Sequence, residues 1–308
     1  MTNQNRYITL TELLGEDKVL LNESMAKHTT FRIGGPVDCF VTPETMEQVK
    51  EVVQFAKEEN IPFYVIGNGS NILVGDQGYR GIIIQIGKQM SKIELEHQGD
   101  EWYVEAEAGV MLSKLAMTIA NQGLTGFEFA AGIPGTLGGA ITMNAGAYGG
   151  EIKDHIVQAV VMNQKGEIRT RTKEELNLSY RHSVIQDENE IVLCARFQFS
   201  EGDKETILAE IKELNMKRKE KQPLEYPSAG STFKRPEGYF AGKLIMDANL
   251  RGYRVGDIMV AEKHCGFVIN VGDGTAKQVR QLINDVQEKV YQQFGVTLEP
   301  EVRFVGEF

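Results

Sequence analysis

The sequence predicts a folded protein that contains both helices and strands, whose patterns alternate along the chain. Composition is the first observation: 42% of the 308 residues are apolar and 25% are charged, close to the globular average, so a sizeable core is available. The second is that short apolar runs bounded by Gly, Asn or Pro alternate with longer segments of helical period. The length has room for two domains, or for one large α/β domain with an added module.

The individual elements follow from periodicity and turn chemistry. Thr42 and Pro43 form a suitable N-cap and first helical residue, and apolar residues at helical spacing then continue to residue 60. Helical spacing predicts further helices at 112–119, 205–221, 239–248 and 275–294. Apolar or alternating runs predict strands at 82–86, 102–108, 157–162, 168–171, 191–199, 264–271 and 301–305. Segment 226–236 is too rich in Pro and Ser for regular structure, and a second module is expected to begin at 202.

Two glycine-rich loops are the candidate ligand-binding elements. The first joins two apolar runs within 64–74 and reads Gly67-Asn68-Gly69-Ser70-Asn71. Because glycine has no Cβ, backbone N–H groups in such a loop can approach a phosphate closely, although a tight turn between strands would look the same. The second loop, 124–150, alternates glycines with apolar anchors, which favours backbone held rigidly against a flat ligand over a flexible linker.

Several classes of protein are disfavoured by charge and motifs. The net charge of −10 argues against sequence-independent binding to nucleic acid or to an anionic membrane. The N-terminus has no apolar signal region, and no apolar run approaches the ~20 residues of a membrane-spanning helix, so we expect a cytoplasmic protein. The widely spaced Cys39, Cys194 and Cys265 indicate neither a disulfide framework nor a zinc site, and no metal is implied. Ile72 replaces the third glycine of a dinucleotide fingerprint, so any nucleotide binds in a non-Rossmann fold.

Basic residues gather at two places on this acidic chain. Lys217, Arg218, Lys219 and Lys221 lie at the end of the helix expected at 205–221, where cations favour the negative pole of the helix dipole. They provide a local surface for an anionic ligand, or they are a solvated helix end. Arg32 precedes a Gly-Gly-Pro turn and could lie over a phosphate or simply end a strand.

Five motifs together resemble the UDP-N-acetylenolpyruvoylglucosamine reductase family. They are IGNGSNILV at 66–74, GIPGTLGGAITMNAGAYGG at 132–150, YRHS at 180–183, GSTFKRP at 230–236 and EPEVRFVG at 299–306. The resemblance implies a vanillyl-alcohol-oxidase-like FAD-binding fold of two subdomains, with a C-terminal α+β substrate domain. The expected limits are 1–201 for the FAD-binding domain, divided at about 85, and 202–308 for the substrate domain, whose last strand returns to the active site.

The activity that the resemblance implies is a two-step reduction in peptidoglycan precursor synthesis. NADPH reduces FAD, and the reduced FAD reduces the enolpyruvyl ether of a UDP-N-acetylglucosamine derivative to UDP-N-acetylmuramate. Related oxidases often tether the flavin through a histidine of the first glycine loop. Because this loop contains Asn71 and no His, we expect FAD to be bound non-covalently.

Three residues are expected to carry the chemistry. Hydride addition to the methylene carbon leaves negative charge on C2 and its carboxylate, which requires a cation and a proton donor. By resemblance, Arg181 neutralises the carboxylate with help from Glu301, and Ser231 donates the proton, with Arg303 as a supporting contact. From residue type alone, Arg181 could be a surface ion pair and Ser231 a turn or N-cap residue. Glu301 and Arg303, two apart on a strand, would then be a solvent-facing pair.

The resemblance also implies binding residues for cofactor and substrate. The expected cofactor-binding residues are Arg32, Gly67, Asn68, Gly69, Ser70, Asn71, Gly132, Ile133, Pro134, Gly135, Gly138, Asn144 and Gly146. The expected contacts to the UDP sugar are Lys221, Arg218 and Arg235. The short segment 202–231 resembles the kind of family member that lacks a substrate-covering loop.

Two other functions compete with this interpretation. One is a flavin oxidase or dehydrogenase of the same fold that acts on an alcohol or hydroxy acid, and the other is a non-catalytic sensor of a nucleotide sugar or flavin. The GSTFKRP motif favours the reductase over the oxidase. The joint presence of Arg181, Ser231 and Glu301 favours catalysis over sensing.

Overall fold

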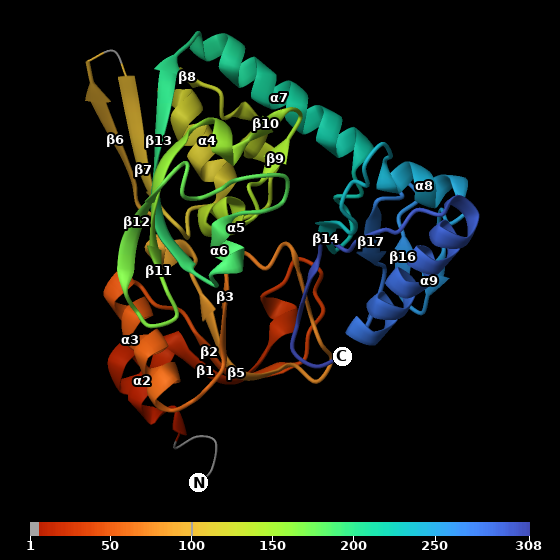
Figure 1. The fold of residues 1–308 in the computed structure, drawn as a ribbon, viewed down its shortest axis with the longest axis horizontal. Helices are drawn as coiled ribbons and strands as arrows, with labels where there is room; N and C mark the ends of the chain where they lie inside the picture. The colour runs from red at the N-terminus through yellow and green to blue at the C-terminus, as the bar shows by residue number, and fades with distance from the viewer. Residues whose placement is uncertain (1–5, 100) are drawn as a thin grey trace. The chain divides into compact units, whose positions relative to one another are not determined.

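The computed structural model describes residues 6–99 and 101–308 (Figure 1). Its contacts divide the chain into two compact units. The first comprises Met1–Leu21, Cys39–Asn68 and Gly81–Arg218, and the second comprises Asn22–Asp38, Gly69–Arg80 and Lys219–Phe308. Both units therefore gather segments that are distant in sequence, whereas the expected limits of 1–201 and 202–308 follow chain order and stay a prediction.

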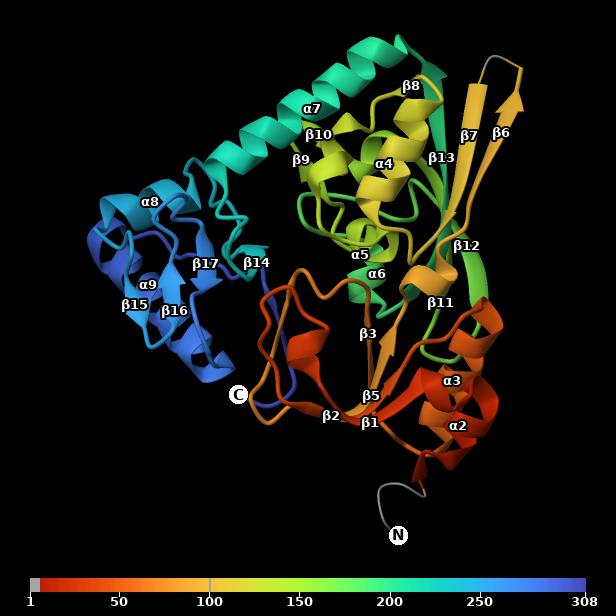
Figure 2. The same ribbon diagram turned by 180° about the vertical axis from the view of Figure 1, so that it is seen from behind.

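The larger sheet of the first unit is six-stranded, and its paired strands run antiparallel. Its strands are β6 (Ile93–Gln98), β7 (Glu101–Glu107), β8 (Leu124–Thr125), β11 (Ile156–Met162), β12 (Ile168–Thr172) and β13 (Ile191–Glu201). Strand β13 is central, with Ala195 opposite Ala106 of β7 and Ala159 of β11. Helices α4 (Leu112–Asn121) and α5 (Leu137–Thr142) lie on one face of this sheet (Figures 1 and 2). The hairpin expected from the pattern at 157–171 is confirmed, since Met162 faces Ile168.

A second sheet has the strand order β1-β2-β5-β3. Its strands are β1 (Val19–Ser24), β2 (Pro36–Val41), β3 (Phe63–Ile66) and β5 (Tyr79–Gln85), and the helices in this part of the chain are α2 (Ile8–Leu14) and α3 (Met46–Glu58). The expected start of α3 at Thr42 and Pro43 is wrong. Thr42 still pairs with the main chain, donating its N–H to Lys18 O at 3.1 Å, and the cap is Thr45, whose hydroxyl accepts from Gln48 N at 3.2 Å.

The glycine-rich segment 124–150 is folded throughout. It contains β8, the 3-10 helix η4 (Glu128–Gly132), helix α5, β9 (Gly146–Ala147) and β10 (Gly150–Glu151). The other short helices of the first unit are η1 (Glu16–Lys18), η3 (Lys88–Met90), η5 (Ile152–Asp154) and α6 (Val184–Asp187). Helix α5 was not expected from the composition, because glycine disfavours helix. It forms where Gly138 packs closely: a Cβ there would lie 3.1 Å from the Ala108 side chain.

Helix α7 (Lys204–Lys221) carries the chain onward from β13. Its apolar side packs on the first unit, where Ile207 and Ile211 are buried in a cluster with Ala120. Gly202 N also donates to Gly123 O at 2.7 Å. The compact first unit for this reason continues past residue 202, as far as Arg218.

The second unit contains a four-stranded sheet and two helices. The sheet has the order β14-β17-β16-β15, formed by β14 (Ser228–Ser231), β15 (Arg254–Val255), β16 (Ile258–Val260) and β17 (Phe267–Asn270). Helices α8 (Ala241–Asp247) and α9 (Ala276–Phe294) contribute Leu244, Ile283 and Val286 to its core. The unit also contains η2 (Met25–Lys27) and the parallel pair β4 (Ile72–Val74) and β18 (Arg303–Val305).

Three expectations for the second unit need correction. Segment 226–236 is not wholly irregular, because Ser228–Ser231 forms β14 and pairs with β17. The strand expected at 264–271 is limited to Phe267–Asn270, and the strand expected at 301–305 begins at Arg303. Glu301 is therefore outside β18, and the alternation rule does not place it on the face that Arg303 occupies.

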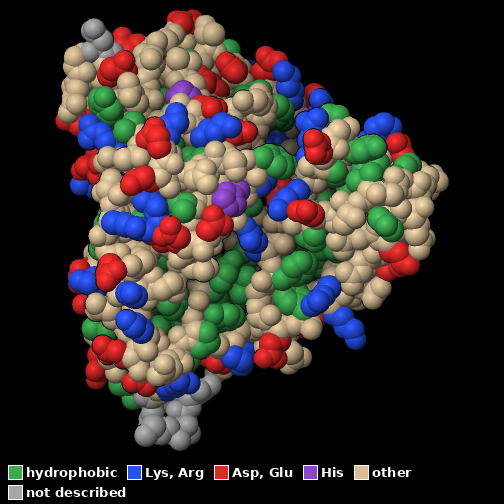
Figure 3. All heavy atoms as spheres, viewed as in Figure 1, with side chains coloured by type: hydrophobic (Ala, Val, Ile, Leu, Met, Phe, Trp, Pro, Cys, Tyr) green, Lys and Arg blue, Asp and Glu red, His purple; other side chains and the backbone are tan. Residues whose placement is uncertain are grey.

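Charged side chains of both signs lie on the surface (Figure 3), as expected from the composition of the sequence. On the face shown in Figure 3, Lys and Arg side chains are interspersed with Asp and Glu. Among the described residues, no helix is both long enough and apolar enough to cross a bilayer.

Candidate active site

The two glycine loops meet within the first unit. Asn68 Nδ2 donates to Pro134 O at 2.6 Å, although the two residues are 66 positions apart. A Cβ on Gly67 would lie 1.9 Å from Thr136 Oγ1, so the loops approach this closely only because residue 67 is glycine. Sequence reasoning predicted both loops but missed Thr136, which precedes α5.

The second glycine loop is anchored near its middle. Leu112 N donates to Gly135 O at 3.0 Å, and Gly138 N donates to Ala108 O at 2.8 Å. These hydrogen bonds fix the main chain at two of the predicted cofactor residues, Gly135 and Gly138.

The remaining residues of the first loop belong to the second unit. Gly69 has φ 61°, and a Cβ there would lie 2.1 Å from His28 O. Gly69 O accepts from Thr30 N at 3.2 Å, so the segment that carries Arg32 lies beside the loop. Arg32 is exposed and has φ 56°.

Asn71 connects the first loop to the C-terminal segment. Its Nδ2 donates to Glu301 O at 3.2 Å, and its main-chain oxygen accepts from Arg303 N at 3.0 Å. The bond from Arg303 N to Asn71 O lies at the start of a parallel strand pair, in which Arg303 is opposite Ile72. Loop and C-terminal segment are thus joined by both side-chain and main-chain hydrogen bonds.

Ser231 and Glu301 lie on adjacent segments of the second unit. Glu301 N donates to the oxygen of Thr232 at 2.8 Å, and Phe233 is bridged to Pro300. The pairing of β14 with β17 shifts register between Ser228 and Ser231, where Gly230 has φ 76°. This bulge determines the direction in which the strand presents Ser231. Two of the three predicted catalytic residues are therefore brought together within one unit.

Arg181 lies at the tip of a tight turn in the first unit. Ser179 and His182 exchange both main-chain hydrogen bonds at 3.1 Å, which leaves Tyr180 and Arg181 between them. The φ of Arg181 is 56°, a left-handed conformation that costs a non-glycine residue ~1 kcal/mol. The guanidinium carbon lies 5.5 Å from the centre of the Tyr180 ring. Backbone strain of this kind persists where surrounding contacts impose it.

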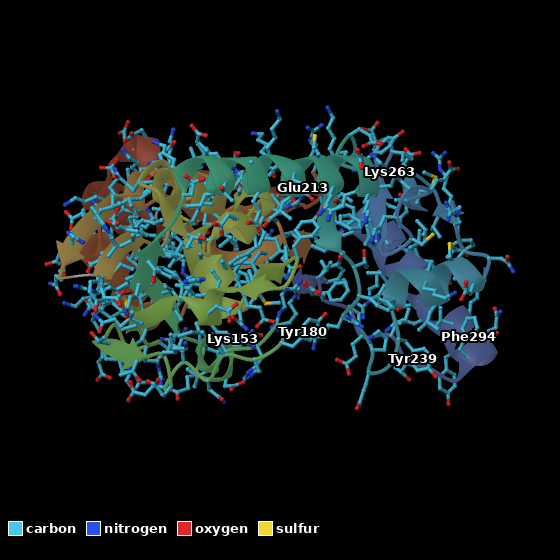
Figure 4. The ribbon with its side chains drawn as sticks, turned by 90° about the horizontal axis from the view of Figure 1, so that it is seen from above. Lys153, Tyr180, Glu213, Tyr239, Lys263 and Phe294 are labelled. Atoms are coloured by element: carbon cyan, nitrogen blue, oxygen red, sulfur yellow. The ribbon has the colours of Figure 1, made fainter. Side chains whose placement is uncertain are left out.

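The carboxylate of Glu151 is connected to the Arg181 turn through the side chain of Asn144. Asn144 is buried, and its Nδ2 donates to Glu151 Oε2 at 2.8 Å and to Ser179 O at 3.1 Å. The Lys153 ammonium, 2.8 Å from Glu151, lowers the pKa of that carboxyl, and the charge of Arg181 adds to the effect. Lys153 and Tyr180 are labelled in Figure 4. The Asn144 side chain thus binds protein groups, and its expected role toward a cofactor stays a prediction, as does that of Gly146.

The predicted substrate-binding residues lie in different surroundings. Arg218 lies against the second glycine loop, since a Cβ on Gly132 would be 3.0 Å from its Nη1, and burial lowers the pKa of Arg218. In the second unit, the Arg235 guanidinium lies 4.0 Å from the centre of the Phe240 ring and its Nε donates to Tyr239 O at 3.2 Å. Lys221 is exposed at the end of α7. Phe240 was not singled out by the sequence patterns.

The residue types of the two loops suit FAD. Within the first unit, the main chain of Gly67 and the hydroxyl of Thr136 are donors of the kind that bind a diphosphate, and a Cβ on residue 67 would collide with that hydroxyl. No histidine is present between Gly67 and Asn71, so this loop has no imidazole that could tether the flavin, and non-covalent binding stays a prediction.

Comparison with known proteins agrees with this chemistry. Residues 37–172 match the FAD binding domain family, and residues 222–305 match the family described as UDP-N-acetylenolpyruvoylglucosamine reductase, C-terminal domain. The α+β fold with an FAD-binding domain and a C-terminal domain of this family is thereby confirmed.

Full-length relatives extend the match. A UDP-N-acetylenolpyruvoylglucosamine reductase from Lachnoclostridium phytofermentans is 56% identical over 298 residues, covering 97% of this chain and 96% of the relative. One from Agathobacter rectalis is 54% identical and covers 99% and 100%. The crystal structure of the enzyme of this name from Thermus caldophilus superposes with a TM-score of 0.80 at 34% identity, over 94% of this chain and 98% of the other. The chain therefore belongs to the UDP-N-acetylenolpyruvoylglucosamine reductase family.

Proposed function

We propose that this protein reduces UDP-N-acetylenolpyruvoylglucosamine to UDP-N-acetylmuramate with NADPH, through non-covalently bound FAD, in the cytoplasmic synthesis of peptidoglycan precursors. Membership of the family and the matched FAD binding domain support the activity. The observation that carries the assignment of roles is the junction in the second unit, where Asn71, Ser231 and Glu301 lie on three hydrogen-bonded segments.

The reaction places a defined demand on the side chains. Bound FAD would supply the hydride chemistry, by which the electron pair of NADPH reaches the methylene carbon of the enolpyruvyl group. Negative charge then develops on C2 and spreads into the neighbouring carboxylate. The protein must stabilise that charge and deliver a proton to C2.

Each of the three proposed catalytic residues has one role. The Arg181 guanidinium is always charged and matches the geometry of a carboxylate, so it stabilises the developing charge. Glu301 assists in holding the carboxylate end of the substrate, with Arg303 behind it. Ser231 donates the proton to C2, and because a serine hydroxyl is a weak acid it requires a cationic neighbour.

The remaining roles concern the anionic parts of both substrates. Lys221, Arg218 and Arg235 bind the diphosphate of the UDP sugar. NADPH and the UDP sugar use one pocket in turn, which gives a ping-pong cycle with two separable half-reactions.

Stopped-flow absorbance under anaerobic conditions tests this proposal. NADPH alone should bleach the flavin of the wild type, and the enolpyruvyl sugar should then restore the colour. We expect Ser231→Ala to be reduced normally and reoxidised more slowly by about 10²- to 10⁴-fold, the typical contribution of a general acid. Ser228→Ala on the same strand is the matched control and should behave as wild type.

Two results would refute the proposed reaction, and a third would remove the role of one residue. No bleaching by NADPH would argue against a reductase and in favour of a sensor. Oxygen consumption with a simple alcohol, without reoxidation by the sugar, would favour the oxidase. Equal rates for Ser231→Ala and the wild type would remove the assigned role of Ser231.

A further inference from the structure

The Arg181 turn, residues Ser179 to His182, is attached to helix α5 through side chains. Gln186 Nε2 donates to two main-chain oxygens, those of Thr142 at 2.6 Å and of Arg181 at 3.2 Å. Ser183 Oγ donates to the same Thr142 oxygen at 2.7 Å. Thr142 is the last residue of α5, where carbonyl groups have no partner within the helix. Gln186 therefore joins the end of α5 to the residue that carries the guanidinium.

Helix α5 connects this end to the predicted flavin loop. It begins directly after Thr136, the residue that Gly67 contacts, and Leu137 N is fixed to Val110 O at 2.8 Å. Its six residues make a spacer of ~9 Å at the usual rise per residue. The main chain of Arg181 thus has a defined position relative to residues 132–138. The Gln186 amide makes the hydrogen bond to the Arg181 oxygen that sets this position.

We infer that Gln186 is a positioning residue for Arg181: its amide holds the main chain of Arg181 in the left-handed conformation at the end of α5. The inference rests on the proposed function, in which Arg181 stabilises the substrate carboxylate. Without the amide, the Arg181 oxygen loses this donor, and nothing in an arginine favours a positive φ. The turn then samples other conformations, and the guanidinium is no longer presented at one place.

This role predicts a defect in only one half-reaction. Negative charge develops on a substrate carboxylate when the enolpyruvyl sugar is reduced, and no such charge develops when NADPH gives up its hydride. A misplaced Arg181 should therefore slow reoxidation of the flavin and leave its reduction unchanged. A merely structural role of Gln186 would instead lower flavin content or slow both steps.

Anaerobic stopped-flow measurement on three FAD-loaded variants tests the inference. Gln186→Leu keeps the approximate size and removes the donor, and Gln186→Glu keeps the shape and cannot donate as a carboxylate. We expect both to slow reoxidation by about tenfold, the equivalent of one hydrogen bond, with reduction by NADPH within about twofold of wild type. Gln186→Lys restores a donor and should recover most of the rate.

The matched control is Gln164→Leu. The Gln164 amide also donates to a main-chain oxygen, that of Asn189, in the same unit. Its loss should leave both half-reactions unchanged. A double variant further distinguishes a positioning role of Gln186 from a merely structural one. In an Arg181→Ala background, Gln186→Leu should add no further slowing of reoxidation, because there is no guanidinium left to position.

The outcomes distinguish this inference from the proposed function. If Arg181→Ala reoxidises at the wild-type rate, the role of Arg181 itself is wrong. If Arg181→Ala is slow but Gln186→Leu and Gln186→Glu match the wild type, the positioning role is wrong. Equal slowing of both half-reactions, or additive effects in the double variant, would also overturn it.

Discussion

The Arg181 turn and the Ser231–Glu301 junction are held in place by different kinds of hydrogen bond. Around Arg181, side chains do most of the holding: Gln186, Ser183 and Asn144 all donate to main-chain oxygens. At the junction, the bonds from Glu301 N to Thr232 O and from Arg303 N to Asn71 O join main-chain groups, beside the one side-chain bond from Asn71 to Glu301 O, and a glycine bulge sets the direction of Ser231. The side-chain hydrogen bonds of the Arg181 turn can each be removed by substituting one polar residue. The main-chain hydrogen bonds of the Ser231–Glu301 junction are instead sensitive to added Cβ atoms and to lost acceptors. The comparison therefore predicts which substitutions disturb each region.

The largest effect on stability is expected at Glu190, which follows the Arg181 turn in the sequence. The carboxylate of Glu190 is buried and accepts from Arg171 Nε at 2.6 Å and from Arg169 Nε at 2.9 Å. Glu190→Ala leaves both guanidinium groups without this partner and should lower the free energy of unfolding by about 3 kcal/mol. Urea denaturation measures this loss, and Glu167→Ala is an exposed control on the β11–β12 hairpin that carries Arg169 and Arg171. A loss below about 1 kcal/mol would show that the pair contributes little.

The next largest effect is expected at Gly69, two residues before Asn71, whose side chain is bonded to Glu301 at the junction. An alanine there combines a φ of 61° with a Cβ 2.1 Å from His28 O, and the loop must move. We expect a loss of about 2 kcal/mol or more together with weaker FAD retention. Gly295→Ala is the matched control, since its φ is 68° and nothing lies within 4 Å of the added Cβ, so it should cost about 1 kcal/mol. Similar losses in both variants would mean that the close approach is unimportant.

A smaller effect is expected at Thr232. This side chain is buried, and its hydroxyl accepts from Val268 N at 3.0 Å, in place of a main-chain partner at the bulge. Thr232→Val keeps the shape and removes the acceptor, which should cost about 1 to 2 kcal/mol in thermal unfolding. Thr232→Ser retains the hydroxyl and should lie closer to wild type. If the two variants are equally stable, the hydroxyl does not support the bulge.

The smallest effect is a pH dependence from His264. Burial lowers the pKa of this imidazole, whose Nδ1 accepts from Gly266 N at 3.1 Å. Because its pKa in the folded protein is below the ordinary 6.5, the unfolded chain binds the proton first as pH falls. The stability contribution is complete above pH 6.5 and is lost as pH falls through the lower folded pKa. His264→Asn should flatten the melting temperature over this range, and an unchanged slope would contradict the prediction.

The sequence alone determined whatever depends on neighbouring residues. Helical period and turn chemistry located α9, which begins with a Thr275–Gln278 capping box and ends at Gly295 with φ 68°. They also located the β11–β12 hairpin and the two glycine loops, and the ordered motifs identified the family. Each of these signals lies within a few tens of residues, so it can be recognised before any contact is known.

The tertiary structure decided what depends on distant partners. Asn71 meets Glu301 across 230 positions of sequence, and the Asn68 side chain reaches Pro134 across 66. Local pattern also misplaced the start of α3 and missed β14 and α5, because pairing with another segment outweighs propensity at those places. The sequence around Arg181 contains no residue pattern that predicts its left-handed conformation. Such a conformation is held by contacts from Gln186 and the end of α5, and packing brings these together only when the chain has folded.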